Sequence, residues 1–219
     1  MRASHTGWTL ATLLAVVTSS ACAGAGYAMA PSPDAASTAE LAALYRARSD
    51  SARMNFTEAD VRFMTGMISH HAQALEMASL APTHDVGTSV GTLTARTINA
   101  QQDEIVAMQQ WLRDRGQPVP EVHADGIDST VRVPDGGMLM PGMLTPQQMR
   151  DLDAARGSDF DRLFLTYMIQ HHGGAVTMVH DLFGTDGAAL DEAVFKIASD
   201  IQADQTSEIA RMKRMLEAY

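Results

Sequence analysis

Hydrophobic residues recur every three or four positions in two segments of the chain, which is the spacing of one face of an α-helix. Residues 63–78 read FMTGMISHHAQALEMA, and residues 164–179 read FLTYMIQHHGGAVTMV. At about 100° per residue, the methionine, histidine and alanine positions of each segment fall within roughly 140° of arc. We therefore predict two amphipathic helices, each with a histidine pair and methionines on its buried face.

A second helical pattern follows each of these segments, at residues 93–116 and 194–216. The two later patterns share a glutamine, a glutamate and a methionine at equal spacings: Gln101, Glu104, Met108, Gln205, Glu208 and Met212. A helix–loop–helix unit is thus written twice, at residues 57–116 and 158–219. Two such hairpins bury their apolar faces most simply against each other, so we predict an all-α fold, a four-helix bundle of two repeated αα-hairpins.

Signals for helix starts precede both histidine segments. TEAD at residues 57–60 and SDFD at residues 158–161 each predict a capping box directly before the periodic pattern. Between the hairpins lies a long connector, residues 117–157, which contains the methionine-rich run MLMPGM at residues 138–143. Near its end, TPQQM predicts that a helix restarts with Pro146 in its first turn.

The first thirty residues have the pattern of an export signal. Arg2 precedes an apolar run at residues 8–17, which is too short to span a bilayer. Cleavage is predicted either after the small-x-small run at residues 28–30 or before Cys22 in a lipobox-like run. The second interpretation is slightly favoured, because Cys22 is the only cysteine and stands where a lipid anchor would be attached. Residues 31–54 then form a tether with a short helix possible at 38–54. We expect an exported protein of the periplasm or outer cell envelope.

Composition narrows the classes of function. The net charge of −10 argues against a nucleic-acid-binding protein, which needs a basic face. A single cysteine allows no internal disulfide, and no later segment has the apolar length of a membrane span. Methionine is frequent, with 15 residues, whereas aromatic residues make up only 5% of the chain. Flexible thioethers therefore take some of the core space that aromatic rings usually fill.

Imidazole and thioether donors on the same helix face point to a soft metal ion. This ligand set suits Cu(I) best, whereas zinc normally recruits cysteine, histidine or carboxylate. Met67 with His71, and Met168 with His172, stand one helical turn apart and form two-donor units. The candidate metal ligands are His70, His71, His171, His172, Met67, Met168, Met64, Met77, Met178, Met140 and Met143.

Other roles for the same residues remain open at this point. His70 and His171 diverge by about 100° from their neighbours, so they serve a second site, a hydrogen bond or donors from another helix. Core packing is the ordinary role of buried histidine and methionine. Glu104 and Glu208 are expected as solvated rim charges, with hydrogen-bond partners of the histidines as the alternative. His180 is a weaker candidate ligand at a helix end.

The doubled motif resembles a known family. MIxHHxxAxxM at residues 67–77 and 168–178, with MPGM at 140–143 and the run at 157–176, is similar to the signature of the domain of unknown function 305 family. The resemblance covers residues 55–219 and implies a ferritin-like four-helix bundle exported to the cell envelope, with copper binding in some members. The second copy of the motif departs from the first at two places. Leu165 stands at the position of Met64, and Gly173-Gly174 stand at the positions of Ala72-Gln73.

These observations favour an exported copper-binding protein that sequesters or delivers its metal. The alternative is an envelope interaction module that binds no metal. A ferritin-like di-metal protein is disfavoured, because its Glu-x-x-His motif is absent from the sequence, and a haem protein would have to bind haem non-covalently. No catalytic residues are predicted, although the sequence leaves an enzyme open. The expected partners are a metal ion, a delivery partner and a membrane reached only through Cys22.

Overall fold

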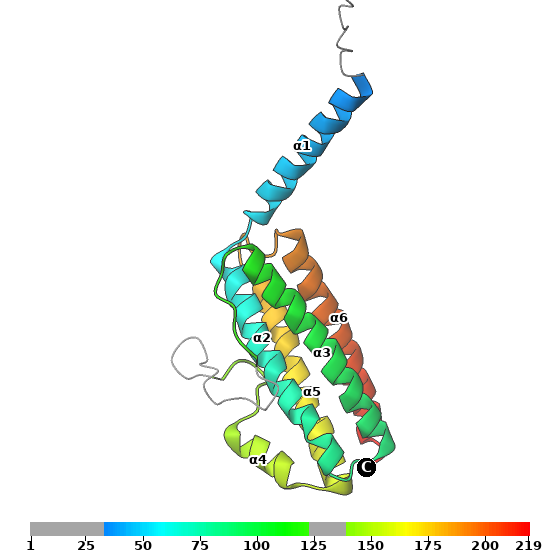
Figure 1. Cartoon of the computed structure of the whole chain (residues 1–219). Helices are drawn as coiled ribbons and strands as arrows, with labels where there is room; N and C mark the ends of the chain where they lie inside the picture. The colour runs from blue at the N-terminus through cyan, green and yellow to red at the C-terminus, as the bar shows by residue number, and fades with distance from the viewer. Residues whose placement is uncertain (1–32, 123–138) are drawn as a thin grey trace, which may run out of the picture. The chain divides into compact units, whose positions relative to one another are not determined.

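The computed structural model describes residues 33–122 and 139–219, and within them it contains helices and no strands (Figure 1). The predicted all-α class is confirmed for this part of the chain. The elements are α1 (Pro33–Arg53), α2 (Glu58–Ser79), the short 3₁₀ helix η1 (Ala81–Thr83), α3 (Thr88–Asp114), α4 (Pro146–Ala154), α5 (Gly157–Phe183) and α6 (Glu192–Leu216). The predicted export signal with Cys22, and Met138 of the connector, lie outside the described residues.

Helix α1 carries exposed apolar side chains, among them Leu41, Leu44 and Tyr45. None of the described helices combines the length and the apolar character needed to cross a bilayer.

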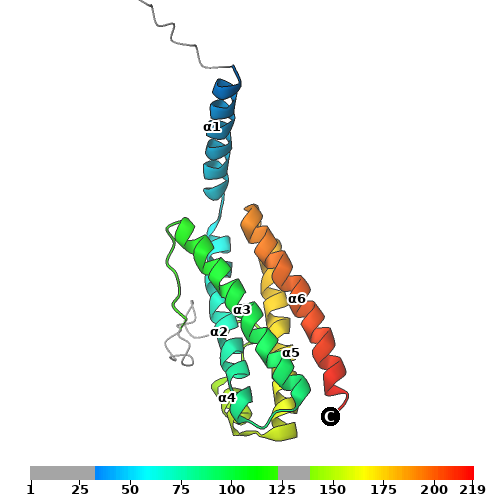
Figure 2. The same cartoon turned by 45° about the vertical axis from the view of Figure 1, so that its right-hand side comes forward.

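The long helices pack as two antiparallel pairs. α2 packs along α3, α5 packs along α6, and α2 and α5 join the two pairs (Figure 2). The short helix α4 lies across the end of the bundle where α2 ends and α5 begins, and it contacts α5. This arrangement brings the two histidine-bearing helices, which are distant in the sequence, side by side.

The core of the bundle is divided in two by a layer of buried polar residues. The first core cluster lies where α2 begins and includes Phe63, Met67, Ile105, Val179 and Ile201. The second lies where α2 ends and includes Met77, Leu93, Phe164, Met168 and Met212. Between them lies what we call the polar belt, whose fully or nearly fully buried members are His70, His71, Thr97, Gln101, His171, His172 and Gln205. Since polar groups in a core are costly without partners, the belt is the feature to explain.

The predicted capping box at the start of α2 is confirmed. The buried Asp60 carboxylate accepts hydrogen bonds from the Thr57 amide at 2.7 Å and from the Thr57 hydroxyl at 2.9 Å, while Thr57 Oγ1 caps the Asp60 amide. The other oxygen of Asp60 accepts from the Ala189 amide at 2.7 Å. One side chain therefore both starts α2 and holds the loop between α5 and α6.

The capping box predicted at residues 158–161 is wrong. Gly157, with a positive φ of 56°, donates its amide to the His84 carbonyl at 2.8 Å, and α5 begins at that glycine. The segment is therefore already helical, and Arg156 precedes it without a side-chain cap. Asp161 instead accepts hydrogen bonds from the Gly87 amide at 3.0 Å and from the Tyr219 hydroxyl at 2.6 Å. The Asp161 carboxylate, which the sequence pattern assigned to a local cap, is therefore bound by residues distant in the sequence.

We predict that Asp60→Ala lowers the free energy of unfolding by about 2–4 kcal/mol, because it removes the carboxylate half of the capping box and leaves the buried Ala189 amide unpaired. Urea unfolding of the purified protein measures this change. The matched control is Gln148→Ala, at the same position of the capping box of α4, where the hydrogen bond from the Thr145 amide is exposed. Equal losses in the two variants would contradict the role of the Ala189 contact.

Candidate metal centre

The histidine pairs of α2 and α5 meet in the middle of the bundle. His70, His71, His171 and His172 are all fully buried. The rings of His70 and His171 lie against each other across the two helices in a tilted arrangement, with centroids 3.8 Å apart and planes inclined by 39°. Within each helix the paired rings are farther apart, at 6.4 Å in α2 and 6.2 Å in α5. The helices thus bring the four imidazoles into one layer, the polar belt.

The outer histidine of each pair is bonded to a glutamate of the neighbouring helix. His71 Nε2 lies 2.6 Å from Glu104 Oε2, and His172 Nε2 lies 2.6 Å from Glu208 Oε2. The glutamate side chains are only 20% and 24% exposed, respectively. The expectation of solvated rim charges is therefore wrong, and the alternative, histidine partners, is confirmed. The sequence signal was the equal spacing of the two glutamates in the paired helices.

The inner histidines use main-chain carbonyls instead. His70 Nε2 lies 3.0 Å from the Pro141 carbonyl, and His171 Nε2 lies 3.0 Å from the carbonyl of His70. A carbonyl oxygen can only accept, so Nε2 must carry the proton in both rings. The remaining ring nitrogen, Nδ1, then holds the lone pair. Of the roles left open for His70 and His171 from the sequence, the structure thus shows the hydrogen bond.

All four Nδ1 atoms of the belt are buried and have no hydrogen-bond partner. The other three members of the belt share this property, since buried side-chain atoms of Thr97, Gln101 and Gln205 are also unpaired. A buried polar atom without a partner costs roughly 1–3 kcal/mol. Unpaired nitrogen and oxygen atoms are therefore concentrated in this one layer of the core.

Burial keeps the inner histidines neutral. The pKa of His70 is lowered to about 3, first by burial and then by the charge that His71 would carry, while the bond to Pro141 opposes the shift. Burial, followed by the neighbouring His70, likewise lowers the pKa of His171 well below its usual value. Near neutral pH both rings are therefore uncharged, which is the form that binds metal ions.

The predicted methionine ligands lie on both sides of the belt. Met64 and Met67 are fully buried in the first core cluster, and Met77 and Met168 are fully buried in the second. Each outer histidine therefore has a methionine one turn away on its own helix: Met67 for His71, in the first core cluster, and Met168 for His172, in the second. The methionines also pack the core, so the same side chains serve stability.

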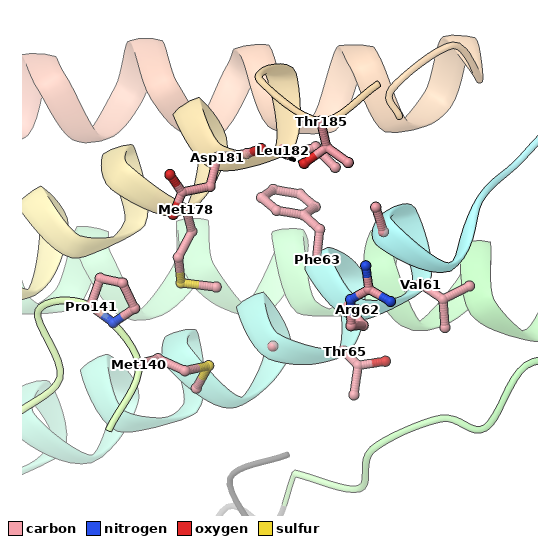
Figure 3. A pocket seen from close by; sticks show the side chains of 12 residues that line it. Val61, Arg62, Phe63, Thr65, Met140, Pro141, Met178, Asp181, Leu182 and Thr185 are labelled. Carbon is pink, nitrogen blue, oxygen red and sulfur yellow. Dashed lines mark hydrogen bonds between the residues drawn. The ribbon is translucent and has the colours of Figure 1, made fainter. Parts of the chain in front are cut away.

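Of the remaining predicted methionines, Met140 and Met143 lie in the connector and Met178 lies on α5. Met140 Sδ and Met178 Cε approach the same point above Gly66, where a Cβ would lie 3.3 Å and 3.4 Å from them. Both side chains line a pocket of about 480 Å³ beside α2 and α5, together with Phe63, Asp181 and other residues (Figure 3). Met143, which is half-buried, closes the turn at residues 140–143 with a hydrogen bond from its amide to the Met140 carbonyl at 3.2 Å.

A close approach of main chains holds this turn against α5. Gly142 has a positive φ of 76°, and a Cβ there would lie 2.7 Å from Gly174 Cα. A Cβ on Gly174 would in turn overlap the Pro141 carbonyl group. Gly174 thus allows the close approach of the turn to α5, whereas Gly173 faces open space.

The belt does not form a conventional metal site from histidine and carboxylate alone. Within residues 33–122 and 139–219, no group of three or more histidine, cysteine, aspartate or glutamate side chains is arranged to hold a metal ion. His180 is exposed at the end of α5, where its ring lies 3.4 Å from the Gln202 amide nitrogen. A metal ion in this bundle therefore needs further donors, and thioether sulfur is the donor that the neighbouring residues offer.

A family model described as Domain of unknown function (DUF305) matches residues 60–216. This chain belongs to the DUF305 family. The match spans the bundle and contains both histidine pairs, the turn at residues 140–143 and the glutamates that bond to the outer histidines. A comparison with proteins of curated function returned no match.

Several solved structures are similar to this DUF305 chain. A DUF305 fragment from Deinococcus radiodurans shares 25% identity at a TM-score of 0.61, covering 75% of this chain and 99% of its own. CopM in its Cu(I)-bound form shares 27% identity at a TM-score of 0.54, covering 73% of this chain and 96% of its own. CopM has also been solved in Cu(II)-bound and Ag-bound forms. Helical relatives of this chain thus include a protein that binds copper.

We predict that acid destabilises the folded DUF305 chain through the inner histidines. Their folded pKa values lie below the usual value of 6.5, so their contribution is fully present above pH 6.5. As the pH falls from 6.5 toward about 3, the unfolded chain takes up protons that folded His70 does not, and the free energy of unfolding drops.

Urea unfolding at about pH 7.5 and about pH 5 measures this loss above the range in which most carboxylates titrate. The comparison variant carries His70→Gln and His171→Gln, which keep an N–H donor but cannot titrate. Its midpoint should change less between the two pH values. An equal change in both proteins would rule out the inner histidines as the source.

Proposed function

We propose that this chain binds copper as cargo in the cell envelope, and that it sequesters or delivers the ion rather than transforming a substrate. The observation that carries the proposal is the set of four buried, unpartnered Nδ1 atoms in the polar belt. Neutral imidazole nitrogens are metal donors, and the belt gives these four no other partner. Similarity to CopM, solved with Cu(I) and Cu(II), supports copper as the metal.

The proposal includes a ferritin-like fold, a four-helix bundle of two repeated hairpins at residues 57–116 and 158–219. The matching pairs His71–Glu104 and His172–Glu208, each at 2.6 Å, support the repeat, because both join corresponding positions. The proposal also retains an export signal at residues 1–30, with lipid attachment at Cys22 as the slightly favoured processing. The domain then comprises residues 55–219, with the connector at 117–157 inside it.

Two half-sites follow from the donor spacing. In one, Met67 and His71 supply sulfur and nitrogen from adjacent turns of α2, and in the other Met168 and His172 do so from α5. His70 and His171 lie between them with their rings in contact. Met64 and Met77 are further thioethers next to the belt, while Met140, Met143 and Met178 lie at the outer turn and pocket.

The donor chemistry favours Cu(I). Thioether and imidazole are soft to borderline ligands, and Cu(I) accepts them at low coordination numbers, whereas zinc prefers thiolate, imidazole and carboxylate. The absence of a histidine–carboxylate metal group from the described residues fits this preference. Neutral donors also bind less tightly than thiolates, which suits an ion that must be passed on.

The glutamates have a positioning role in this proposal. Glu104 and Glu208 accept from Nε2 of the outer histidines, so each ring is held with its Nδ1 lone pair free. A carboxylate in this position also raises the basicity of the ring nitrogen that binds the metal. Neither glutamate is assigned as a ligand.

We predict that replacing Met67 and Met168 together by leucine weakens Cu(I) binding at least about tenfold, because each half-site loses its sulfur donor. Leucine keeps the volume, so the fold should lose less than about 1.5 kcal/mol per site. Competition with a chromophoric Cu(I) chelator under anaerobic conditions measures the affinity, and Zn(II) titrated in parallel should bind more weakly than Cu(I).

The matched control replaces Met108 and Met212 by leucine. These methionines are equally buried in the two core clusters but lie on α3 and α6 and are not proposed as ligands. The control should retain the affinity of the unmodified protein. If the protein binds no Cu(I), and a variant with all four belt histidines changed to alanine behaves identically with every ion, the alternative of a metal-free interaction module is correct.

A further inference from the structure

We propose that residues 140–143, here called the cover, form a hinged lid over the belt, and that its displacement lets a soft metal ion in and out. The inference rests on the proposed function for the identity of the ion, but the movement itself can be tested without metal. The observations that carry it are the contacts of the cover with α2 and α5 and the firmer attachment of Leu144, the residue that follows it.

The C-terminal end of the cover is firmly attached. Leu144 follows it directly and is 1% exposed, packed in the second core cluster. The buried Gln73 side chain bonds the main chain of Leu144 twice, donating to its carbonyl at 3.0 Å and accepting from its amide at 2.7 Å. The capping box of α4 begins at the next residue, Thr145. Leu144 is therefore a fixed point about which the preceding residues can turn.

The cover itself is held by weaker contacts. The Pro141 carbonyl accepts from His70 Nε2 at 3.0 Å, and the Gly142 carbonyl accepts from the exposed Gln170 amide at 3.3 Å. Its closest packing is the contact of Gly142 with Gly174, which buries no side chain. The cover and Leu144 each make two hydrogen bonds with the bundle, but only Leu144 adds a buried side chain. In the cover, Met140 and Met143 are half-buried and Pro141 is exposed, so the cover is the part that can move.

Displacement of the cover would open the belt at one place. Pro141 supplies the hydrogen-bond acceptor for His70 Nε2, and the ring of His70 lies directly against that of His171. When the Pro141 carbonyl leaves, His70 loses its partner and becomes reachable from outside the bundle. Both inner histidines are fully buried with the cover in place. The cover is thus bonded to the ring of His70, which in turn lies against the ring of His171.

The pocket beside the cover provides the outer end of this route. Met140 belongs to the cover, and its sulfur and the Cε of Met178 of α5 both lie close to the position that a Cβ on Gly66 would take. Both methionine side chains line the pocket (Figure 3). Pro141 also lines the pocket, so one face of the cover borders the pocket while its carbonyl bonds to the belt. A soft ion would meet two thioethers in the pocket before it reaches imidazole nitrogen, and Met140 would move with the cover.

The adjacent glycines of α5 offer a matched test. Gly174→Ala places a methyl group where the Pro141 carbonyl lies, so the cover must move away, whereas Gly173→Ala places the same group in open space. Both substitutions raise helix propensity equally, so the difference between them reports the cover alone.

The first measurement uses the metal-free protein and follows the modification of His70 by diethyl pyrocarbonate with mass spectrometry. We expect Gly174→Ala to react at least about tenfold faster than Gly173→Ala, because the population with the cover displaced increases. The second measurement follows the transfer of bound Cu(I) to an excess of chelator, which should accelerate in the same order. Equal modification rates in the two variants would contradict the proposal that the cover moves.

A second variant keeps the test decisive if Gly174→Ala unfolds, which circular dichroism detects. Gln170→Ala removes the hydrogen bond to Gly142 without inserting any group, and it should increase His70 modification more modestly. An unchanged rate there, with Gly174→Ala unfolded, would also overturn the cover. The two proposals can fail separately. If Gly174→Ala speeds His70 modification but the protein binds no Cu(I), the cover is supported and the proposed function is contradicted. If the protein binds Cu(I) but the two glycine variants are modified at equal rates, the proposed function is supported and the cover is contradicted.

Discussion

The hydrogen bonds of the histidine Nε2 atoms are the interactions on which the rest of the bundle depends. Four fully buried imidazoles in a helical core are costly unless their N–H groups are paired. Each bond that meets this need also joins two elements of the chain. His71 ties α2 to α3 through Glu104, and His172 ties α5 to α6 through Glu208. The inner pair ties α5 to α2 and α2 to the connector. The same bonds therefore fix the bundle and direct four lone pairs inward.

The polar belt also explains the distribution of methionine in this core. Apolar side chains are separated into two clusters, and each cluster meets the belt with methionine rather than with an aromatic ring, Met67 on one side and Met168 on the other. A thioether packs as an apolar side chain and can still donate to a soft ion, so no rearrangement of the core is needed to provide sulfur. Large aromatic residues such as Phe160 and Phe164 stack farther from the belt, in the second cluster.

Much of this fold follows from local sequence patterns, whereas the partners of the belt do not. Helical periodicity predicted the buried faces of α2 and α5, and the capping box at Thr57 marked the start of α2, because these signals depend on residues within one turn. The capping box expected at Asp161 failed because distant groups, the Gly87 amide and the Tyr219 hydroxyl, bind that carboxylate. Likewise, Glu104 is recognised as a histidine partner only once the packing of α3 on α2 is known. The ligand assignments remain predictions.

One residue links the two halves of the belt. His70 donates from its ring to the Pro141 carbonyl, and its own main-chain carbonyl accepts from His171. The α2 half therefore responds to the connector directly, while the α5 half responds to it only through the backbone of His70. Two segments that carry the same motif thus make different contacts with the connector. The bundle is therefore asymmetric although it is built from two similar hairpins: the histidines of α2 are one bond from residues 140–143, and the histidines of α5 are farther away along the chain of bonds.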